Sequence, residues 1–389
     1  MSFFALMNIG FDAKRAYHNN TGLGFFSRVL IRLLADQYPE HTYYLFNPRP
    51  GKSFQPHLAN IREVLPKAAL HRLLSAAWRS RWVTGDLTRM GIDLYHGLSH
   101  EIPAGLPQTG IPSVVTIHDL FPEIYPEQYK PIDVKIYRAK LRYACRHATK
   151  IMAISEETKG HIIRTYGTPA EKIEVVYQSC APAFTVLENA AKKEAVREKY
   201  GLPGSFFLHV GTIIERKNLL NICKALNSIR NDIPLPLVVV GNDGGLKGKV
   251  TAYLKEVQLE DRVYFLSEQL ALAGRKPFVD AEDLPALYQL ATAMIYPSYF
   301  EGFGMPIIEA MAGGVPVITS TTSCLPEIAG NAAWLADPDS PEEMASGFRK
   351  IYTDATFAAD MRRKGLENAQ RFRPEVYAAD TMKLYQSIL

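Results

Sequence analysis

The residues best suited to chemistry on a phosphorylated ligand are two glutamates, Glu301 and Glu309, separated by seven residues. Glu301 follows an apolar run, residues 293–296, that predicts a buried strand, and Glu309 lies in a helix expected to begin at Pro306. A helix start offers N–H groups and a positive dipole end to a phosphate. A nearby carboxylate accepts hydrogen bonds from vicinal hydroxyls. The pattern indicates a nucleotide or sugar phosphate site, the alternative being a loop with two unrelated glutamates.

A pair of cations and a set of glycines add to this site. Gly302 and Gly304 would let a ligand approach the backbone closely. Arg216 and Lys217 follow another expected strand, residues 206–210. Cations placed in advance lower the cost of the charge that develops on a departing diphosphate. The alternative for the Arg–Lys pair is a solvated basic turn before a helix.

The first half of the chain has its own candidates. His118 and Asp119 follow an expected strand, residues 113–117. A lone histidine is more often structural, but the carboxyl end of a strand favours function, and Asp119 would either cap a helix or orient His118. Gly22 and Gly24 open a helix after the first strand, where a tight turn is the alternative to a ligand role.

The segment YFEGFGMPIIE, ending at Glu309, resembles the E-x7-E motif of family 4 retaining glycosyltransferases, which have the GT-B fold. LHVGTIIERKN, ending at Asn218, and TIHDLFP, which contains His118, resemble two further blocks of that family. The resemblance spans nearly the whole chain. Two departures matter: Thr212 stands where many relatives have arginine, and the link at residues 267–281 is long. In relatives, this link lies near the pocket for the nucleotide base, so the identity of the base is left open.

The resemblance implies roles for individual residues. Glu301 would hold hydroxyls of the donor sugar and His118 would approach its reacting carbon, so these two are the candidate catalytic residues. Glu309 would hold the donor ribose. The remaining implied donor-binding residues are Gly22, Gly24, Arg216, Lys217, Phe303, Gly304 and Met305. No metal or other cofactor is implied, because the cations and the helix end replace it. The D-x-D string at residues 337–339 leads into a helix start and is interpreted as a loop and cap.

These residues must be positioned by alternating strands and helices, which predict parallel sheets covered on both faces. The fold class expected is α/β, with two doubly wound Rossmann-like domains facing a central cleft, the GT-B arrangement. Ligands bind at the carboxyl ends of such strands. The domains expected are residues 1–180, on the acceptor side, and 181–372, which bind the nucleotide sugar; a helix at 373–389 packs back on the first. Strands are expected at residues 5–9, 43–46, 94–96, 113–117, 150–154, 173–176, 206–210, 236–240, 263–266, 293–296, 315–319 and 332–335.

Length and composition agree with a soluble globular protein of two or three domains. The chain has 389 residues, 47% hydrophobic and 22% charged. No apolar run of about 18 residues predicts a membrane span, and the N-terminus is interpreted as a first buried strand, not a signal peptide. The four cysteines are scattered, which argues against a zinc site or a disulfide framework and favours the cytoplasm.

Charge is uneven along the chain. Residues 1–180 hold 22 Lys and Arg against 15 Asp and Glu, and the remainder holds 22 against 25. Basic stretches at residues 71–89, with Trp78 and Trp82, and at 130–150 suit peripheral contact with an anionic membrane at its inner face. The alternative is solvated helix faces packed by tryptophan. The bias is too mild, and stacking motifs too few, for nucleic-acid binding.

The function expected is transfer of a hexose from a nucleoside diphosphate sugar to a hydroxyl of a glycan or lipid-linked glycan, with retention of configuration. The cation block resembles bacterial mannosyltransferases, so GDP-mannose is the leading donor and UDP-sugars come next. The motifs contain no obvious carboxylate nucleophile, which favours a front-face route. A nucleotide-sugar epimerase and a non-catalytic binder are the less favoured alternatives. Acceptor, linkage and oligomeric state stay open.

Overall fold

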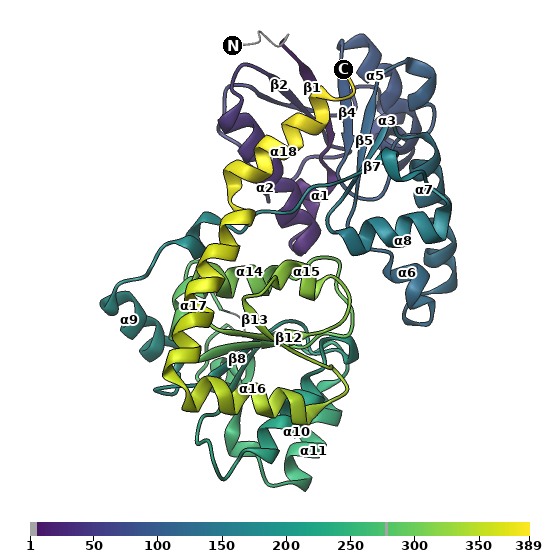
Figure 1. Ribbon diagram of the computed structural model, residues 1–389. Coiled ribbons are helices and arrows are strands. Elements are labelled where there is room, and N and C mark those ends of the chain that lie inside the picture. Colours follow the sequence, from purple (N-terminus) through teal and green to yellow (C-terminus); the bar gives the residue numbers. More distant parts are fainter. Residues whose placement is uncertain (1–5, 277–278) are drawn as a thin grey trace. The chain divides into compact units, whose positions relative to one another are not determined.

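A computed structural model of the protein describes residues 6–276 and 279–389, which form two compact units (Figure 1). Unit 1 comprises Met1–Ser179 and Pro374–Leu389, and unit 2 comprises Cys180–Arg373. Each unit is built on its own parallel sheet with helices packed on both faces. The chain therefore enters unit 2 once and returns to unit 1 for its last helix.

Unit 1 has a seven-stranded sheet in the order β3-β2-β1-β4-β5-β6-β7. The central strands are buried along their whole length because both faces are covered, which suits apolar runs such as SVVTI in β5. Ile9 of β1 pairs with Tyr43 on one side and Leu94 on the other, where the strand order reverses. The strands are β1 Asn8–Asp12, β2 Thr42–Phe46, β3 Ile61–Val64, β4 Leu94–Gly97, β5 Ser113–Ile117, β6 Lys150–Ala153 and β7 Ile173–Val175.

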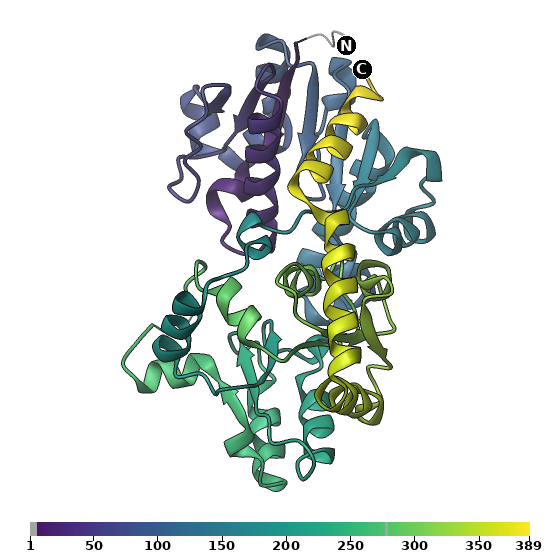
Figure 2. The same ribbon diagram turned by 60° about the vertical axis from the view of Figure 1, so that its left-hand side comes forward.

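Helices cover both faces of this sheet, and the last one comes from the C-terminus. Helix α18 packs against α2 (Figures 1 and 2). Its Tyr385 hydroxyl lies 2.6 Å from His96 Nδ1 in the core. Ser155 caps α8 by accepting from Thr158 N at 3.1 Å. The helices are α1 Lys14–His18, α2 Gly22–Gln37, α3 Ala69–Leu73, α4 Ser75–Ala77, α5 Val83–Arg89, α6 Phe121–Ile124, α7 Pro131–His147, α8 Glu156–Tyr166 and α18 Pro374–Gln386.

Unit 2 has a six-stranded sheet in the order β10-β9-β8-β11-β12-β13, again parallel. Its order reverses between β8 and β11, so the loops that follow these two strands are neighbours. The strands are β8 Phe207–Val210, β9 Leu237–Val240, β10 Val263–Phe265, β11 Ala293–Tyr296, β12 Val317–Ser320 and β13 Ala333–Ala336. The helices are α9 Ala190–Tyr200, α10 Leu219–Ser228, α11 Lys247–Glu256, α12 Leu266–Leu272, α13 Leu284–Leu290, α14 Met305–Ala312, α15 Leu325–Ala329, α16 Pro341–Thr353 and α17 Ala355–Ala369.

Two details of unit 1 differ from the sequence prediction. The first strand runs from Asn8 to Asp12, three residues later than expected, and Ala5 of the predicted strand lies outside the described residues. Asp12 can end a buried strand because Arg79 pairs with its carboxylate. Strand β3 was not predicted, because IREV is a half-exposed edge strand with two charged residues. In unit 2, the long link at 267–281 begins within α12, and its residues 277 and 278 lie outside the described residues.

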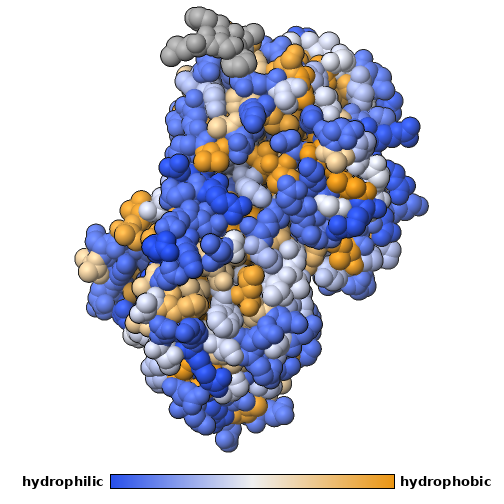
Figure 3. All heavy atoms as spheres, in the orientation of Figure 1, coloured by the Kyte–Doolittle hydropathy of each residue, from blue (hydrophilic) through white to orange (hydrophobic). Residues whose placement is uncertain are grey.

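The surface carries hydrophobic atoms in separate patches among hydrophilic ones on the face drawn in Figure 3. Across residues 6–276 and 279–389, no helix combines the length and the hydrophobicity that a bilayer span requires.

Candidate active site

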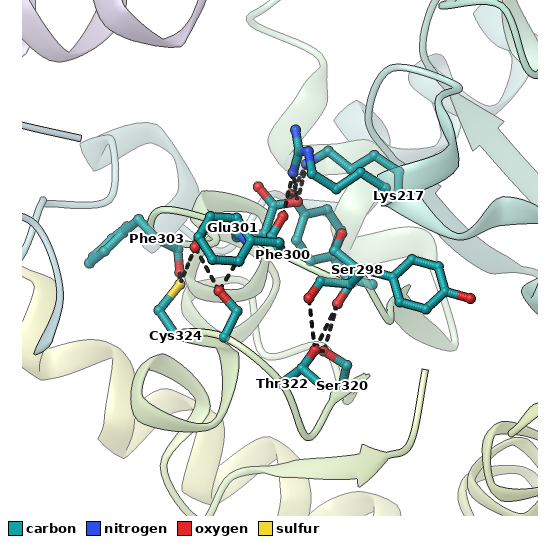
Figure 4. A network of polar contacts seen from close by, with 12 residues as sticks. Lys217, Ser298, Phe300, Glu301, Phe303, Ser320, Thr322 and Cys324 are labelled. Atoms are coloured by element: carbon teal, nitrogen blue, oxygen red, sulfur yellow. Dashed lines mark hydrogen bonds and ion pairs between the residues drawn. The ribbon is translucent and has the colours of Figure 1, made fainter. Parts of the chain in front are cut away.

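Glu301 lies at the centre of a buried ion cluster at the carboxyl edge of the unit 2 sheet. Its Oε1 accepts from Lys217 Nζ at 2.6 Å, from Arg216 Nη1 at 2.7 Å and from the Tyr296 hydroxyl at 3.1 Å. Figure 4 shows the Glu301 carboxylate turned toward Lys217. Arg216 also donates to the Phe300 carbonyl at 2.6 Å. The structure thus brings together three of the residues that the sequence singled out.

The cluster is electrostatically coupled. Burial alone would raise the pKa of Glu301, but Lys217 and Arg216 lower it to about 2, so this carboxylate is ionised. Burial and the neighbouring Arg216 lower the pKa of Lys217, while Glu301 opposes them. Two cations therefore face one carboxylate, which leaves a surplus positive charge for an anionic ligand.

The two loops meet because their strands are neighbours in the sheet. Arg216 and Lys217 lie in a short 3-10 helix after β8, and Glu301 lies in the loop of residues 297–304 after β11, here named the E-loop. Tyr299 N donates to the Arg216 carbonyl at 2.9 Å. Asn218, in the left-handed region at φ 62°, donates through Nδ2 to the Pro297 carbonyl at 3.1 Å. These bonds hold the cations against the E-loop.

The E-loop ends with a glycine directly before α14. Gly304 precedes the helix with φ 104°, and a Cβ there would lie 2.9 Å from Leu325 Cδ2. Only glycine suits this position. Met305 is the first helical residue, while the Phe303 ring packs edge-on against Phe372 at 5.8 Å. The proposed anion-binding end of α14 therefore lies directly after the Glu301 loop.

A polar segment that starts at the last residue of β12, residues 320–324, holds the E-loop in place through hydrogen bonds, and the sequence analysis did not single it out. Ser323 Oγ donates to the Glu301 carbonyl at 2.8 Å and accepts from the Glu301 amide at 3.1 Å. Cys324 Sγ donates to the Phe303 carbonyl at 3.1 Å (Figure 4). Thr322 Oγ1 donates to the Tyr299 carbonyl at 3.0 Å. The run STTSC directly after an expected strand was the available signal.

Glu309 lies in α14 and contacts Tyr288 of α13. The Tyr288 hydroxyl donates to Glu309 Oε2 at 2.8 Å. Burial raises the pKa of Glu309 to about 7, and the bond from Tyr288 acts against this. Near neutral pH the carboxyl is thus poised between its two forms, and a donor of further hydrogen bonds would favour the ionised one.

A small pocket lies beside the ends of β8 and β9, where the long link begins. It has a volume of about 170 Å³ and includes Val210, Val240, Leu266 and Leu270 in its lining. Helix α12, which supplies Leu266 and Leu270, is the start of that link. The pocket is mostly apolar, as a site for a flat ring would be.

The D-x-D string, residues 337–339, has a structural role. Asp339 accepts from the Tyr299 hydroxyl at 2.8 Å, and Ser340 caps α16 by accepting from Glu343 N at 3.2 Å. Glu343 also accepts from Asp337 N at 2.8 Å, which ties the D-x-D loop to the first turn of α16. The loop-and-cap interpretation is confirmed. Within the described ranges, no group of three or more His, Cys, Asp and Glu residues is arranged to hold a metal ion.

In unit 1, His118 is buried at the end of β5. Its Nε2–H donates to the Leu98 carbonyl at 3.0 Å, and its backbone N–H donates to His100 Nε2 at 2.9 Å. Burial lowers the pKa of His118 to about 4, so the imidazole is neutral at physiological pH and presents Nδ1 as an acceptor. Asp119 accepts from Phe121 N at 3.1 Å, a bond that holds the turn leading into α6, although the N-cap position of that helix is Leu120.

The two glycines of unit 1 differ in their surroundings. A Cβ on Gly24 would lie 1.8 Å from the Asn19 carbonyl oxygen, whereas a Cβ on Gly22 would meet nothing within 4 Å. Glycine is therefore required at position 24, which packs closely against the turn before α2. No contact within unit 1 requires glycine at position 22. His118 and these glycines belong to unit 1, whereas Glu301, Glu309 and the cations belong to unit 2.

Two family models together match most of the chain. Residues 21–180 match the model "Glycosyltransferase Family 4", and residues 192–371 match "Glycosyl transferases group 1". With the two parallel-sheet units, these matches place the chain among the family 4 glycosyltransferases of the GT-B fold. The family and the fold class expected from the sequence are both confirmed. The protein is a glycosyltransferase.

Individual relatives refine the comparison. The O-antigen chain mannosyltransferase B of Escherichia coli is 26% identical over 98% of this chain and 100% of its own length. The O-antigen chain mannosyltransferase RfbU of Salmonella typhimurium is 30% identical over 65% of this chain and 63% of its own. The crystal structure of Anabaena Alr3699/HepE in complex with UDP superposes with a TM-score of 0.73 at 17% identity, covering 98% of this chain and 100% of that one.

Proposed function

We propose that the chain is a retaining mannosyltransferase that uses GDP-mannose and transfers mannose to a hydroxyl of a glycan or lipid-linked glycan. The observation that carries the proposal is the cluster of Arg216, Lys217 and Glu301 beside the start of α14. The cluster combines surplus positive charge, helix N–H groups and a buried carboxylate at the carboxyl edge of the unit 2 sheet. A nucleoside diphosphate sugar needs all three.

In this proposal each part of the cluster takes one part of the donor. Arg216, Lys217 and the α14 start bind the diphosphate, with Gly304 and the amides around Phe303 and Met305 close to it. Glu309 accepts from the ribose hydroxyls, and Glu301 from hydroxyls of the sugar. In this proposal, the apolar pocket beside α12 receives the nucleotide base.

The chemistry proposed is a front-face displacement. As the sugar–phosphate bond breaks, the cations stabilise the charge on the leaving diphosphate, whose oxygen takes the proton of the incoming hydroxyl. His118, neutral and with an accepting Nδ1, binds a sugar hydroxyl near the reacting carbon. Gly22 and Gly24 are included in this proposal as donor-binding residues. The protein supplies position and charge, and no metal is part of this proposal.

The mannose assignment rests on the two O-antigen mannosyltransferases to which the chain is similar. The alternative is a UDP-sugar, since the structural neighbour HepE was solved with UDP. The epimerase and the non-catalytic binder are not proposed, because the chain belongs to the family 4 glycosyltransferases.

The test is a panel of nucleotide sugars assayed for hydrolysis and for thermal stabilisation. GDP-mannose should be turned over and should raise the melting temperature most. Lys217→Ala and Glu309→Ala should each lower donor turnover more than tenfold, whereas the exposed Lys224→Ala, on α10, should not. Near-normal turnover in both site variants would reject the assignment, and the anomeric configuration of the product, read by NMR, decides retention.

Peripheral contact with an anionic membrane is part of the same proposal, at the cytoplasmic face that the cysteine usage favours. The exposed apolar side chains of unit 1 include Leu73 at 80% and Ile132 at 60% exposure, next to basic residues of α3 and α7. Trp78 cannot contribute, because it is fully buried and donates to Asp86 at 2.7 Å. Co-sedimentation with vesicles containing phosphatidylglycerol at low salt should be lost in Leu73→Ser/Ile132→Ser, and wild-type protein that stays in solution would reject membrane contact.

A further inference from the structure

A second basic site lies in unit 1, at the carboxyl ends of β1 and β2. A pocket of about 460 Å³ is lined by four cations, Lys14, Arg49, Arg79 and Lys140. Lys14 follows β1, Arg49 follows β2, and Lys140 lies on α7. Its volume is within the range of small-molecule sites, roughly 300–1,000 Å³, and its position is the edge of an open parallel sheet where ligands bind.

The floor of this basic pocket is an internal ion network. Arg79 is 8% exposed and donates through Nε to Asp12 Oδ1 at 2.9 Å and Oδ2 at 3.0 Å. Its Nη2 also pairs with Glu101, whose other oxygen accepts from Lys140 Nζ at 2.6 Å. Although burial acts against it, the two carboxylates raise the pKa of Arg79. The network fixes a guanidinium against the pocket wall, so a ligand would meet preorganised charge.

The charges of the pocket do not balance. Asp12 and Glu101 are both engaged by Arg79, and Lys140 shares Glu101. Within the described part of the chain, neither Lys14 Nζ nor the Arg49 guanidinium has a carboxylate within ion-pair distance. Partial burial and the charge of Arg79 lower the pKa of Lys14, which an incoming anion would relieve. Two positive charges in excess suit a group with about two negative charges, such as a phosphate monoester or a diphosphate.

We propose that this basic pocket binds a phosphate or diphosphate group, and, resting on the proposed function, that the group belongs to the acceptor. Lys14 and Arg49 contact the phosphoryl oxygens. Arg79 and Lys140, both paired with Glu101, line the bottom of the pocket and limit how far the group enters. The acceptor hydroxyl then belongs to a sugar whose phosphate or diphosphate is anchored in unit 1. The basic pocket is built from residues of unit 1, whereas the Arg216–Lys217 cluster is built from residues of unit 2.

The first experiment titrates the full-length protein with inorganic pyrophosphate by calorimetry at low salt. Because the unit 2 cations also attract pyrophosphate, the titration is done in the Lys217→Ala background. Binding should persist there, weaken at least tenfold on adding Lys14→Ala and Arg49→Ala, and be unaffected by Lys130→Ala and Arg146→Ala. The control pair removes the same charge from exposed positions of unit 1 outside the pocket. Equal binding by both sets of variants would overturn the proposal.

The second experiment addresses the acceptor. In transfer assays, Lys14→Ala/Arg49→Ala should raise the KM for a phosphate- or diphosphate-bearing glycan at least tenfold and leave donor hydrolysis and donor KM unchanged. A lipid-linked and a water-soluble phosphorylated acceptor, assayed side by side, distinguish the two sources of the group. An unchanged acceptor KM for both would reject the acceptor assignment. Pyrophosphate binding without any donor turnover would instead uphold the pocket and reject the proposed function.

Discussion

Glu301 Oε1 and Lys217 Nζ lie 2.6 Å apart, although 84 positions separate the two residues in the sequence. The same oxygen pairs with Arg216 at 2.7 Å. One carboxylate thus partly neutralises both cations proposed to bind the donor diphosphate. Because the two cations outnumber this carboxylate, a donor diphosphate can bind to them while Glu301 stays paired, so no buried charge is left without a partner.

Replacing Glu301 by glutamine keeps its size and removes its charge. We expect Glu301→Gln to bind a nucleoside diphosphate more tightly, by roughly three- to tenfold or about 1 kcal/mol, because the cations lose their internal anion. Sugar transfer should fall more than tenfold, because a carboxylate no longer binds the sugar hydroxyls. Calorimetry and turnover measure the two effects. Weaker diphosphate binding in this variant, with Glu198→Gln unchanged, would show that Glu301 mainly positions the cations.

Glu309 should make stability depend on pH. Its pKa is about 7 in the folded protein against an ordinary 4.5, so the folded state binds the proton more tightly. This stabilisation is complete below pH 4.5 and is lost as pH rises through 7, a change of up to roughly 3 kcal/mol. Thermal unfolding of wild type and Glu309→Gln should therefore diverge as the pH rises from about 5 to about 8.

The same titration should appear in ligand binding. Ribose hydroxyls donate best to an ionised carboxylate, so nucleoside diphosphate affinity should increase through about pH 7 in the wild type. Glu309→Gln should bind more weakly and show a flatter pH profile. A wild-type profile as flat as that of the variant would contradict the role proposed for Glu309.

His118 should make unit 1 sensitive to acid. Its pKa is about 4 in the folded protein against 6.5, because burial disfavours the charged imidazole. Stability is therefore complete above pH 6.5 and is lost as pH falls through 4, by up to roughly 3 kcal/mol. His118→Asn should reduce this acid dependence, measured by urea unfolding at a series of pH values. An NMR titration with the His118 imidazole charged at pH 6 would contradict the neutral form.

The two glycines in the first turn of α2, Gly22 and Gly24, should respond differently to alanine. Gly24→Ala should lower stability by about 1–3 kcal/mol, because its Cβ meets backbone. Gly22→Ala should leave the melting temperature unchanged, because its Cβ meets open space. If Gly22 lies against the donor, as proposed, Gly22→Ala should still weaken donor turnover, and normal turnover would exclude Gly22 from the site.

Local pattern was enough for much of the fold. Apolar runs of four or five residues between amphipathic stretches predicted both parallel sheets, because burial on both faces demands continuous hydrophobicity. The caps at Ser155 and Ser340 were likewise predictable, since a cap is satisfied within three residues of itself. The half-exposed β3 escaped prediction because its residues lack that signal.

By itself, the sequence determined the alternating strands and helices, the residues with chemical potential, and the loops on which they lie. Only the tertiary structure decided that Glu301 contacts Arg216 and Lys217, that Tyr288 contacts Glu309, and that Arg79 joins Asp12 and Glu101. The physical reason is that such contacts depend on which strands are neighbours in a sheet, and not on spacing along the chain. Burial, which shifts the pKa of Glu301 down and that of Glu309 up, exists only once the sheets and helices have packed.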